Sequence, residues 1–132
     1  MSDPQVYSNT NEVIHRFNRA FLEHDASLLV DLVADDCIME SLEPAPDGTR
    51  YEGREACLQF WQNLAKDANG SFTPEDVVVL GDRAIILWRY HFGAGQEQSV
   101  RGVNVMRVRE GKVVEALGYV KSGDRAVGDA LR

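Results

Sequence analysis

The sequence predicts an α+β fold in which a strongly bent, mostly antiparallel sheet wraps around a long helix. Two observations support this prediction. Apolar residues recur at helical spacing through residues 6–24, whereas β-branched and aromatic residues dominate several runs between residues 72 and 121. Helices grouped early and strands grouped late are typical of this fold class. The length of 132 residues suits a single domain, which we expect to span residues 1–132.

Three helices are expected in the first half of the chain. The apolar stripe of residues 6–24 predicts the first helix. Asp25 has a side chain suited to an N-cap and predicts a second helix over residues 26–33. A third helix is expected over residues 53–66, because its apolar residues share one face and Gly70 follows as a stop signal.

Apolar runs bounded by turn residues predict strands at residues 37–42, 50–51, 72–80 and 84–92. The last element is a long hairpin over residues 99–121. Its turn is expected at Glu110-Gly111, because glycine supplies the positive φ that a short hairpin loop needs.

One face of this hairpin combines small residues with a single amide. Alternation places Gly102 and Asn104 on one face of the first arm, and Gly118 and Val120 on one face of the second. Small side chains leave room above the sheet, so Asn104 is a candidate polar group in a pocket wall. Alternatively, Asn104 hydrogen-bonds locally and the glycines permit the sheet to bend.

Composition excludes several classes of partner. The net charge of −7 argues against nucleic acid, because no basic stripe is present to neutralise phosphates. No run approaches the ~20 apolar residues of a membrane span, and no signal peptide is recognisable. Cys37 and Cys57 lie in apolar segments and are expected to be buried, reduced thiols. We therefore expect a cytoplasmic protein with no membrane or nucleic-acid partner.

Three short motifs follow one another along the chain: Val33–Ser41 (VADDCIMES), Tyr51–Ala56 (YEGREA) and Val103–Val113 (VNVMRVREGKV). Their order and spacing resemble the nuclear transport factor 2-like superfamily, and within it the SnoaL-like and ketosteroid-isomerase-like branch. The resemblance covers residues 8–121 and leaves residues 1–5 and 123–132 as flexible ends. It implies a SnoaL-like domain with a cone-shaped, curved and mostly antiparallel sheet wrapped around helices, a pocket between them, and often a dimer formed through the outer face of the sheet. Because this fold hosts both enzymes and non-enzymes, it does not fix the activity.

The resemblance also shows which catalytic groups are replaced. The steroid isomerases use a tyrosine, an aspartate base and a protonated aspartic acid, and the matching positions here are Phe17, Ser41 and Asn104. Of these, only Asn104 can still donate a hydrogen bond to an oxyanion. The carboxylate that takes the proton is absent, so isomerisation by that mechanism is not expected.

A comparison with the limonene-epoxide-hydrolase branch bears on residues 84–92. Its catalytic arginine matches Arg89, and its two aspartates match His91 and Gly118. This implies that Arg89 and His91 face the cavity, in conflict with the simpler expectation that Trp88 and its alternating neighbours do so. We adopt the orientation with Arg89 and His91 inward.

The candidate catalytic residues are His91, Arg89, Asn104 and Glu40. His91 would be the general acid or base, because its charge changes near neutral pH. Arg89 or Asn104 would hold a developing oxyanion, and Glu40 would orient or stabilise charge. Alternatively, Arg89 pairs with an acidic neighbour on the sheet and His91 is a solvated residue at the end of a strand.

The candidate substrate-binding residues are Phe17, Ser41, Trp61, Trp88, Gly102, Gly118 and Val120. The two tryptophans could stack on a planar ligand or simply belong to the core. The three histidines lack neighbours at metal-ligand spacing, and no glycine-rich phosphate loop precedes a helix. We therefore expect no metal and no cofactor.

Two functions remain open at this stage. The protein is either a cofactor-independent acid–base enzyme of isomerase, cyclase or dehydratase type, acting on a small apolar carbonyl or hydroxyl compound, or a non-catalytic module for ligand binding or dimerisation. The expected partners are a small molecule and a second copy of the chain, bound through the outer sheet face. The residues of that face are Val103, Val105, Leu117 and Tyr119.

Overall fold

The computed structural model describes residues 4–44 and 46–121 and confirms the α+β class. Of the predicted flexible ends, residues 1–5 and 123–132, residues 1–3 and 123–132 lie outside the described residues, whereas Pro4 and Gln5 already belong to the first helix, contrary to the prediction. The helices are α1 (Pro4–Leu22), the short 3-10 helix η1 (Ala26–Leu29) and α2 (Arg54–Lys66). The strands are β1 (Val33–Glu40), β2 (Arg50–Glu52), β3 (Ser71–Leu80), β4 (Arg83–Phe92), β5 (Gln98–Arg109) and β6 (Lys112–Val120).

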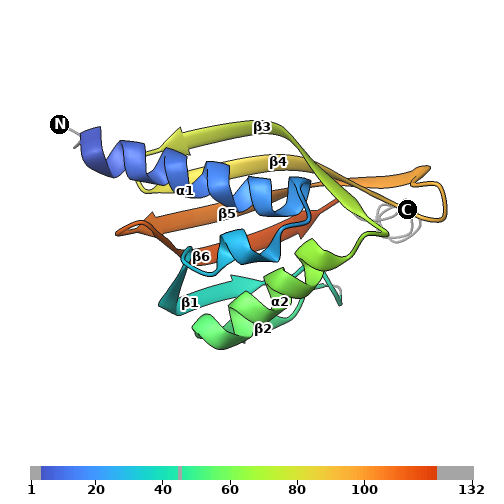
Figure 1. Ribbon diagram of the computed structural model, residues 1–132, viewed down its shortest axis with the longest axis horizontal. Coiled ribbons are helices and arrows are strands. Elements are labelled where there is room, and N and C mark those ends of the chain that lie inside the picture. The colour runs from blue at the N-terminus through green and yellow to red at the C-terminus, as the bar shows by residue number, and fades with distance from the viewer. Residues whose placement is uncertain (1–3, 45, 122–132) are drawn as a thin grey trace, which may run out of the picture.

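The six strands form one sheet in the order β2-β1-β6-β5-β4-β3. Every neighbouring pair is antiparallel except β1 and β6, which run parallel. Figure 1 shows α1 and α2 covering the same face of the sheet, with α1 over the half that contains β3 and β4, and α2 beside β1 and β2. The other face carries no helix of the described chain. The sheet is therefore covered on one side only.

Two predicted boundaries were wrong. The helix expected over residues 26–33 is the single 3-10 turn η1, and the strand expected at residues 37–42 already begins at Val33. The reason is a contact distant in sequence: Val33 pairs with Val113, and the Val113 amide donates to the Leu32 carbonyl at 2.6 Å. Pairing with β6 extends the chain where local propensity favours a helix.

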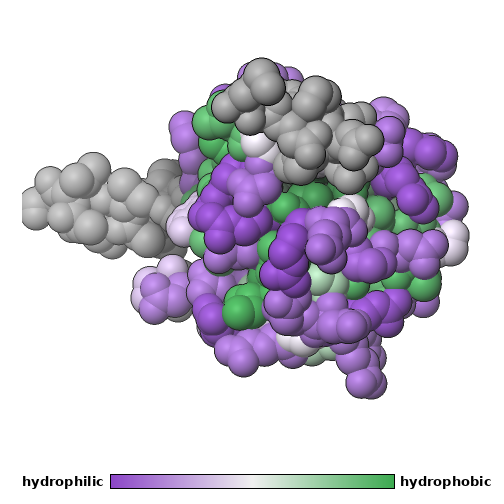
Figure 2. All heavy atoms as spheres, turned by 90° about the vertical axis from the view of Figure 1, so that its left-hand side faces the viewer, coloured by the Kyte–Doolittle hydropathy of each residue, from purple (hydrophilic) through white to green (hydrophobic). Residues whose placement is uncertain are grey.

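The hydrophobic core lies between the sheet and its covering helices. Its fully buried side chains include Ile14, Leu29, Leu32, Met106 and Val113, from α1, η1, the turn before β1, β5 and β6. Figure 2 views the end that lies on the left of Figure 1, where hydrophobic side chains reach the surface only in separate areas between hydrophilic ones. Within the described residues, none of the helices has the length and apolar character needed to cross a membrane.

Candidate functional site

A cavity of about 630 Å³ lies between the sheet and α2, and residues of the core such as Met39, Trp61 and Trp88 form part of its wall. Its wall is formed where β1, β4 and β6 end and where β3 and β5 begin, on the right of Figure 1. The lining side chains include Met39, Leu42, Tyr51, Phe60, Trp61, Leu64, Phe72, Trp88, Tyr90, Phe92, Val100, Asn104, Ala116, Gly118 and Val120. The wall is thus mainly apolar and aromatic, as small-molecule pockets usually are.

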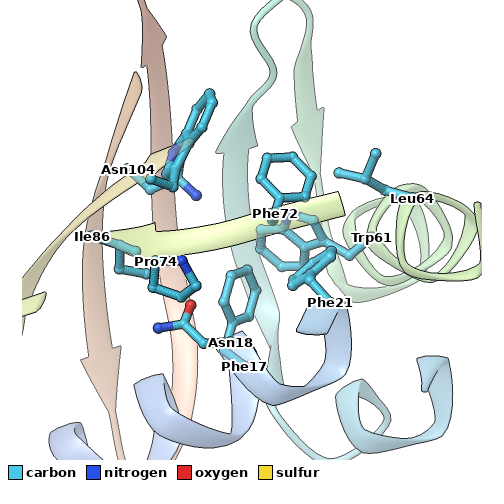
Figure 3. Close-up of a pocket in the computed structure, with 10 residues that line it drawn as sticks. Phe17, Asn18, Phe21, Trp61, Leu64, Phe72, Pro74, Ile86 and Asn104 are labelled. Carbon is cyan, nitrogen blue, oxygen red and sulfur yellow. The ribbon is translucent and has the colours of Figure 1, made fainter. Parts of the chain in front are cut away.

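A narrow recess of about 50 Å³ adjoins this cavity on the side of α1. Figure 3 shows Asn104 and Ile86 on the strands, Trp61 and Leu64 on α2, and Phe17 and Phe21 on α1 around it. Asn104 and Trp61 line both spaces. Asn104 therefore stands where the large cavity meets the inner recess.

Aromatic side chains contact one another along the cavity wall. Phe17 meets Trp61 edge to face, at a ring-centroid distance of 5.1 Å and an angle of 87°. Phe72 meets Trp88 in the same way, at 5.3 Å and 82°, and Tyr90 at 4.5 Å with a tilt of 41°. Edge-to-face and tilted contacts are favourable arrangements of aromatic rings. The wall is consequently a fixed surface, built from α1, α2, β3 and β4.

The predicted orientation of β4 is wrong. Trp88 is buried and lines the cavity, whereas Arg89 and His91 lie on the outer face of the sheet. Arg89 binds Glu75 at 3.3 Å and donates to the Ser99 hydroxyl at 2.9 Å. The cause is the energetic difference between the two faces: burying aromatic rings is favourable, whereas burying a guanidinium without a partner is costly. Arg89 and His91 are removed from the candidate catalytic site.

Glu40 and Ser41 lie at the cavity mouth, but their polar groups are engaged elsewhere. Alternation from the buried Met39 turns the Glu40 carboxylate to the outer face, where Arg50 binds it at 3.3 Å. The Ser41 hydroxyl donates to the Glu43 carbonyl at 2.9 Å and accepts from the Thr49 amide at 3.1 Å. Glu40 is therefore not placed to act beside Asn104, contrary to the sequence-based expectation.

The other predicted binding residues divide into two groups. Gly118 and Val120 line the large cavity, and Phe17 lines the inner recess. Gly102 does not line either space, because the Trp88 indole covers it: a β-carbon at Gly102 would lie 2.4 Å from Cζ2 of Trp88. Gly102 therefore supports the indole and is not a ligand contact.

Asn104 is placed as predicted and has one hydrogen-bond partner. The indole Nε1–H of Trp88 donates to Oδ1 of Asn104 at 3.1 Å. Asn104 pairs in register with Ile86 on one side and Gly118 on the other. The two alternatives considered for Asn104 thus both hold, since it bonds locally and also faces a cavity.

Five of the lining residues have titratable side chains, namely Glu40, Glu43, Tyr51, Tyr90 and Lys121, although the carboxylate of Glu40 points to the outer face. Burial, and then the nearby charge of Asp67, raise the pKa of Tyr90, so its hydroxyl is neutral at physiological pH. Among the described residues, no group of three or more His, Cys, Asp and Glu is arranged to hold a metal ion.

Several lining residues are not among the predicted ones, namely Tyr51, Phe60, Leu64 and Phe72. Tyr90 and Phe92 recur with Trp88 at a period of two, which marks one face of a strand, and this face is the simpler expectation that the sequence analysis set aside in favour of Arg89 and His91. The aromatic residues of α2 and β3 carried no such signal, because a helix stripe looks the same over a core as over a cavity.

Comparison with known proteins agrees with this geometry. The family model for the SnoaL-like domain matches residues 14–116. An NTF2-like protein of unknown function from Mesorhizobium loti has a similar structure, with a TM-score of 0.84 and 45% identity over 92% of this chain and 98% of that one. No curated protein matches the chain.

More distant structures share the fold alone. A candidate ketosteroid isomerase from Kribbella flavida aligns with a TM-score of 0.74 and 17% identity, over 89% of this chain and 81% of that one. An LEH-like epoxide hydrolase from Mycobacterium tuberculosis aligns with a TM-score of 0.69 and 14% identity, over 91% of this chain and 83% of that one. Taken with the site geometry, the family match leads to one conclusion: the chain belongs to the SnoaL-like domain family, within the NTF2-like fold.

Proposed function

We propose that this protein binds a small, largely apolar molecule in the cavity between the sheet and α2. The volume of about 630 Å³ lies within the range of roughly 300–1,000 Å³ that is typical of small-molecule sites. The aromatic wall provides the apolar contact surface. Binding there would transfer the hydrocarbon part of the ligand from water to the apolar surface formed by Trp61, Phe72 and Trp88.

The observation that carries the proposal is the position of Asn104. Its amide lines both the large cavity and the inner recess, and the other residues around the recess are apolar or aromatic except for Asn18 on α1. One well-placed polar group in an apolar pocket is the usual device for fixing the orientation of a ligand. Asn104 is therefore the proposed polar anchor.

Binding without acid–base catalysis is the form of this function that the geometry supports better. Arg89 and His91 lie on the outer face, and the Glu40 carboxylate is bound by Arg50. A general acid or base must come within hydrogen-bond reach of the proton it moves. None of these three side chains meets that condition at Asn104.

A cavity-filling variant tests this proposal, with the bicyclic ketone 2-tetralone as the probe. Val120→Trp should abolish binding, because its larger side chain occupies the cavity that Val120 lines. Tyr119→Trp is the matched control, since Tyr119 directly precedes Val120 and its side chain is 54% exposed on the other face of the sheet. Ligand-observed NMR measures binding. Equal loss of binding in both variants, or no binding to the unmodified protein, would contradict the proposal.

A second candidate function, self-association, is favoured by the uncovered face of the sheet. The paired register places a continuous apolar set there: Val78, Ile85, Leu87, Val103, Val105, Leu117 and Tyr119. Several of these side chains are more exposed than apolar residues usually are, including Leu87 at 36% and Val78 at 46%. Contiguous exposed apolar surface of this kind marks interaction sites. We propose that a second copy of the chain covers it.

Sedimentation equilibrium tests this second candidate. A charge at the centre of the face, Leu87→Glu, should convert a dimer to a monomer, because the carboxylate would be desolvated in the interface. Leu22→Glu is the control, because Leu22 is 51% exposed on α1, on the other side of the sheet. If the unmodified protein stays monomeric at high concentration, the proposed dimer is excluded.

A further inference from the structure

The inner recess that adjoins the large cavity is narrow and mainly apolar. Its volume is about 50 Å³, against about 630 Å³ for the large cavity. Of its 10 lining residues, Asn18 and Asn104 are polar, and all the others are aromatic or aliphatic. The two spaces share a set of lining residues: Trp61, Leu64, Phe72, Trp88 and Asn104. A ligand in the large cavity therefore lies next to the recess.

Aromatic rings form an unbroken series of contacts along the wall of the recess. Trp61 contacts Phe17 at a ring-centroid distance of 5.1 Å, and Phe17 contacts Phe21 at 5.0 Å (Figure 3). Phe21 in turn contacts Phe72 at 5.7 Å, and Phe72 contacts Trp88 at 5.3 Å. The series joins α2, α1, β3 and β4, so four elements of the fold contribute to one wall.

These ring contacts limit the width of the recess. All but one of the rings in the series are buried, namely Phe17, Phe21, Trp61 and Trp88. To widen the recess, at least one ring would have to move away from its neighbours and give up favourable contacts. A group that is too wide for a packed apolar site is bound poorly for this reason. The recess therefore favours a slender group.

The volume of the recess sets the size of that group. A benzene ring fits a cavity of about 150 Å³, so the ring body of a ligand must stay in the large cavity. One water-sized atom needs roughly 10–15 Å³, so a recess of about 50 Å³ accommodates a chain of roughly three or four such atoms. Among the described residues, no ionisable side chain lines the recess, so a charged group would find no partner there.

From these observations we infer that the site selects ligands with a ring-sized body and one slender, unbranched apolar substituent of about three carbon atoms. The body occupies the large cavity, and the substituent enters the recess between Phe17, Phe21 and Ile86. The inference rests on the proposed binding function and adds the shape of the ligand. A branched substituent of the same size is excluded, because it is wider than the recess at its first carbon atom.

Two isomeric probes that differ only in branching test the inference: 4-n-propylphenol and 4-isopropylphenol. Because they have the same number of carbon atoms, they bury nearly the same apolar surface in a cavity of unrestricted shape. Their dissociation constants for the unmodified protein are measured by NMR titration. We expect the n-propyl isomer to bind about four-fold more tightly, which is the effect of one further buried methylene group.

The outcomes of this titration separate the inference from the proposed function. Equal affinities of the two isomers, tighter binding of the isopropyl isomer, or no binding of either phenol to a protein that binds 2-tetralone would overturn the inference and leave the proposed function standing. Failure of all three probes to bind would instead contradict the proposed function.

Phe21→Leu and Phe60→Leu are matched variants that locate the selectivity. Phe21 lines the recess and not the large cavity, whereas Phe60 lines the large cavity and not the recess. Phe21→Leu interrupts the series of rings and widens the recess, so the affinity ratio of the two isomers should fall towards one. Phe60→Leu should keep the ratio. A ratio that persists in Phe21→Leu would overturn the assignment of the selectivity to the recess. Since the ratio in the unmodified protein needs no variant, a folding defect in Phe21→Leu would leave the main test intact.

Discussion

At the scale of single residues, Gly102 and Trp88 share one space. A β-carbon at Gly102 would lie 2.4 Å from Cζ2 of Trp88 and 2.4 Å from the backbone oxygen of Tyr119. Both distances are far inside van der Waals contact, and the backbone oxygen belongs to the paired strand β6. The glycine is therefore required by the close approach of the indole, and the indole in turn orients Asn104.

This contact predicts the effect of Gly102→Ala. The added methyl group must displace either the indole or the strand, and overpacking of this kind typically costs about 1–3 kcal/mol of the free energy of unfolding. Urea-induced unfolding measures the change. Gly95→Ala is the control, because its β-carbon would meet only the end of the flexible Glu97 side chain. Equal stability of the two variants would contradict the prediction.

At the scale of elements, β3, β4 and β5 are joined on the outer face by one acidic residue. Glu75 lies where the register between β3 and β4 shifts, and it binds Arg89 of β4 at 3.3 Å and Arg101 of β5 at 3.0 Å. Desolvation raises the pKa of Glu75, but the hydrogen bonds from Arg101 and Arg89 outweigh it, so the net pKa is lowered. One carboxylate thus links three strands.

A pH dependence follows for Glu75→Gln. Because the folded-state pKa of Glu75 lies below the unfolded value of about 4.3, its stabilising effect is complete above that value and is lost as the pH falls through the folded pKa. The variant should be less stable than the unmodified protein at pH 7, and the difference should shrink below about pH 4. Urea unfolding at a series of pH values measures it.

Glu12→Gln is the control for this test, because it removes an exposed carboxylate of α1 that forms no ion pair among the described residues. It measures the effect of the change in net charge alone. A difference between Glu75→Gln and the unmodified protein that stays constant, or grows, towards acid pH would show that the ion pairs do not link these strands.

The two helices are also fixed as elements. The Nδ1 of His24, just after α1, lies 2.9 Å from the Ala65 carbonyl near the end of α2. Since a carbonyl only accepts, Nδ1 carries the proton. This bond and the contact between Phe17 and Trp61 hold α1 against α2, so both cavity walls contributed by helices keep their spacing.

At the scale of the whole molecule, a packed core and a cavity adjoin each other between the sheet and the helices. The packed part lets the sheet and helices fold as a unit, while the cavity remains available for a ligand. Cys37 on β1 and Cys57 on α2 lie within the packed part and are fully buried. Their thiols can therefore report on the opening of that part.

Thiol labelling provides the measurement. Burial is the main cause that raises the pKa of both thiols, and only the thiolate reacts. In the folded protein, both cysteines should react with a disulfide reagent at the rate of opening, and immediately once urea unfolds the chain. Ala68→Cys supplies an exposed thiol as a control. Rapid reaction of Cys37 or Cys57 in native buffer would show that the packed part around these residues opens independently of global unfolding.

Much of this molecule follows from local sequence. The turn at Glu110-Gly111 is confirmed by its positive φ angles of 52° and 78°, and alternation along the hairpin places Asn104 and Gly118 on the inner face as predicted. Such features depend on a few neighbouring residues: the turn type sets the register of a hairpin, and the register sets which side chains share a face.

Other features of the fold and of the site depend on the tertiary structure alone. The parallel pairing of β1 with β6 and the inward side of β4 depend on contacts between residues far apart in the chain, and a one-residue shift exchanges every side chain between the two faces. The bond between Trp88 and Asn104 arises from that same register between β4 and β5. The residues of the site could therefore be found in the sequence only in part, because their assembly is a property of strand pairing.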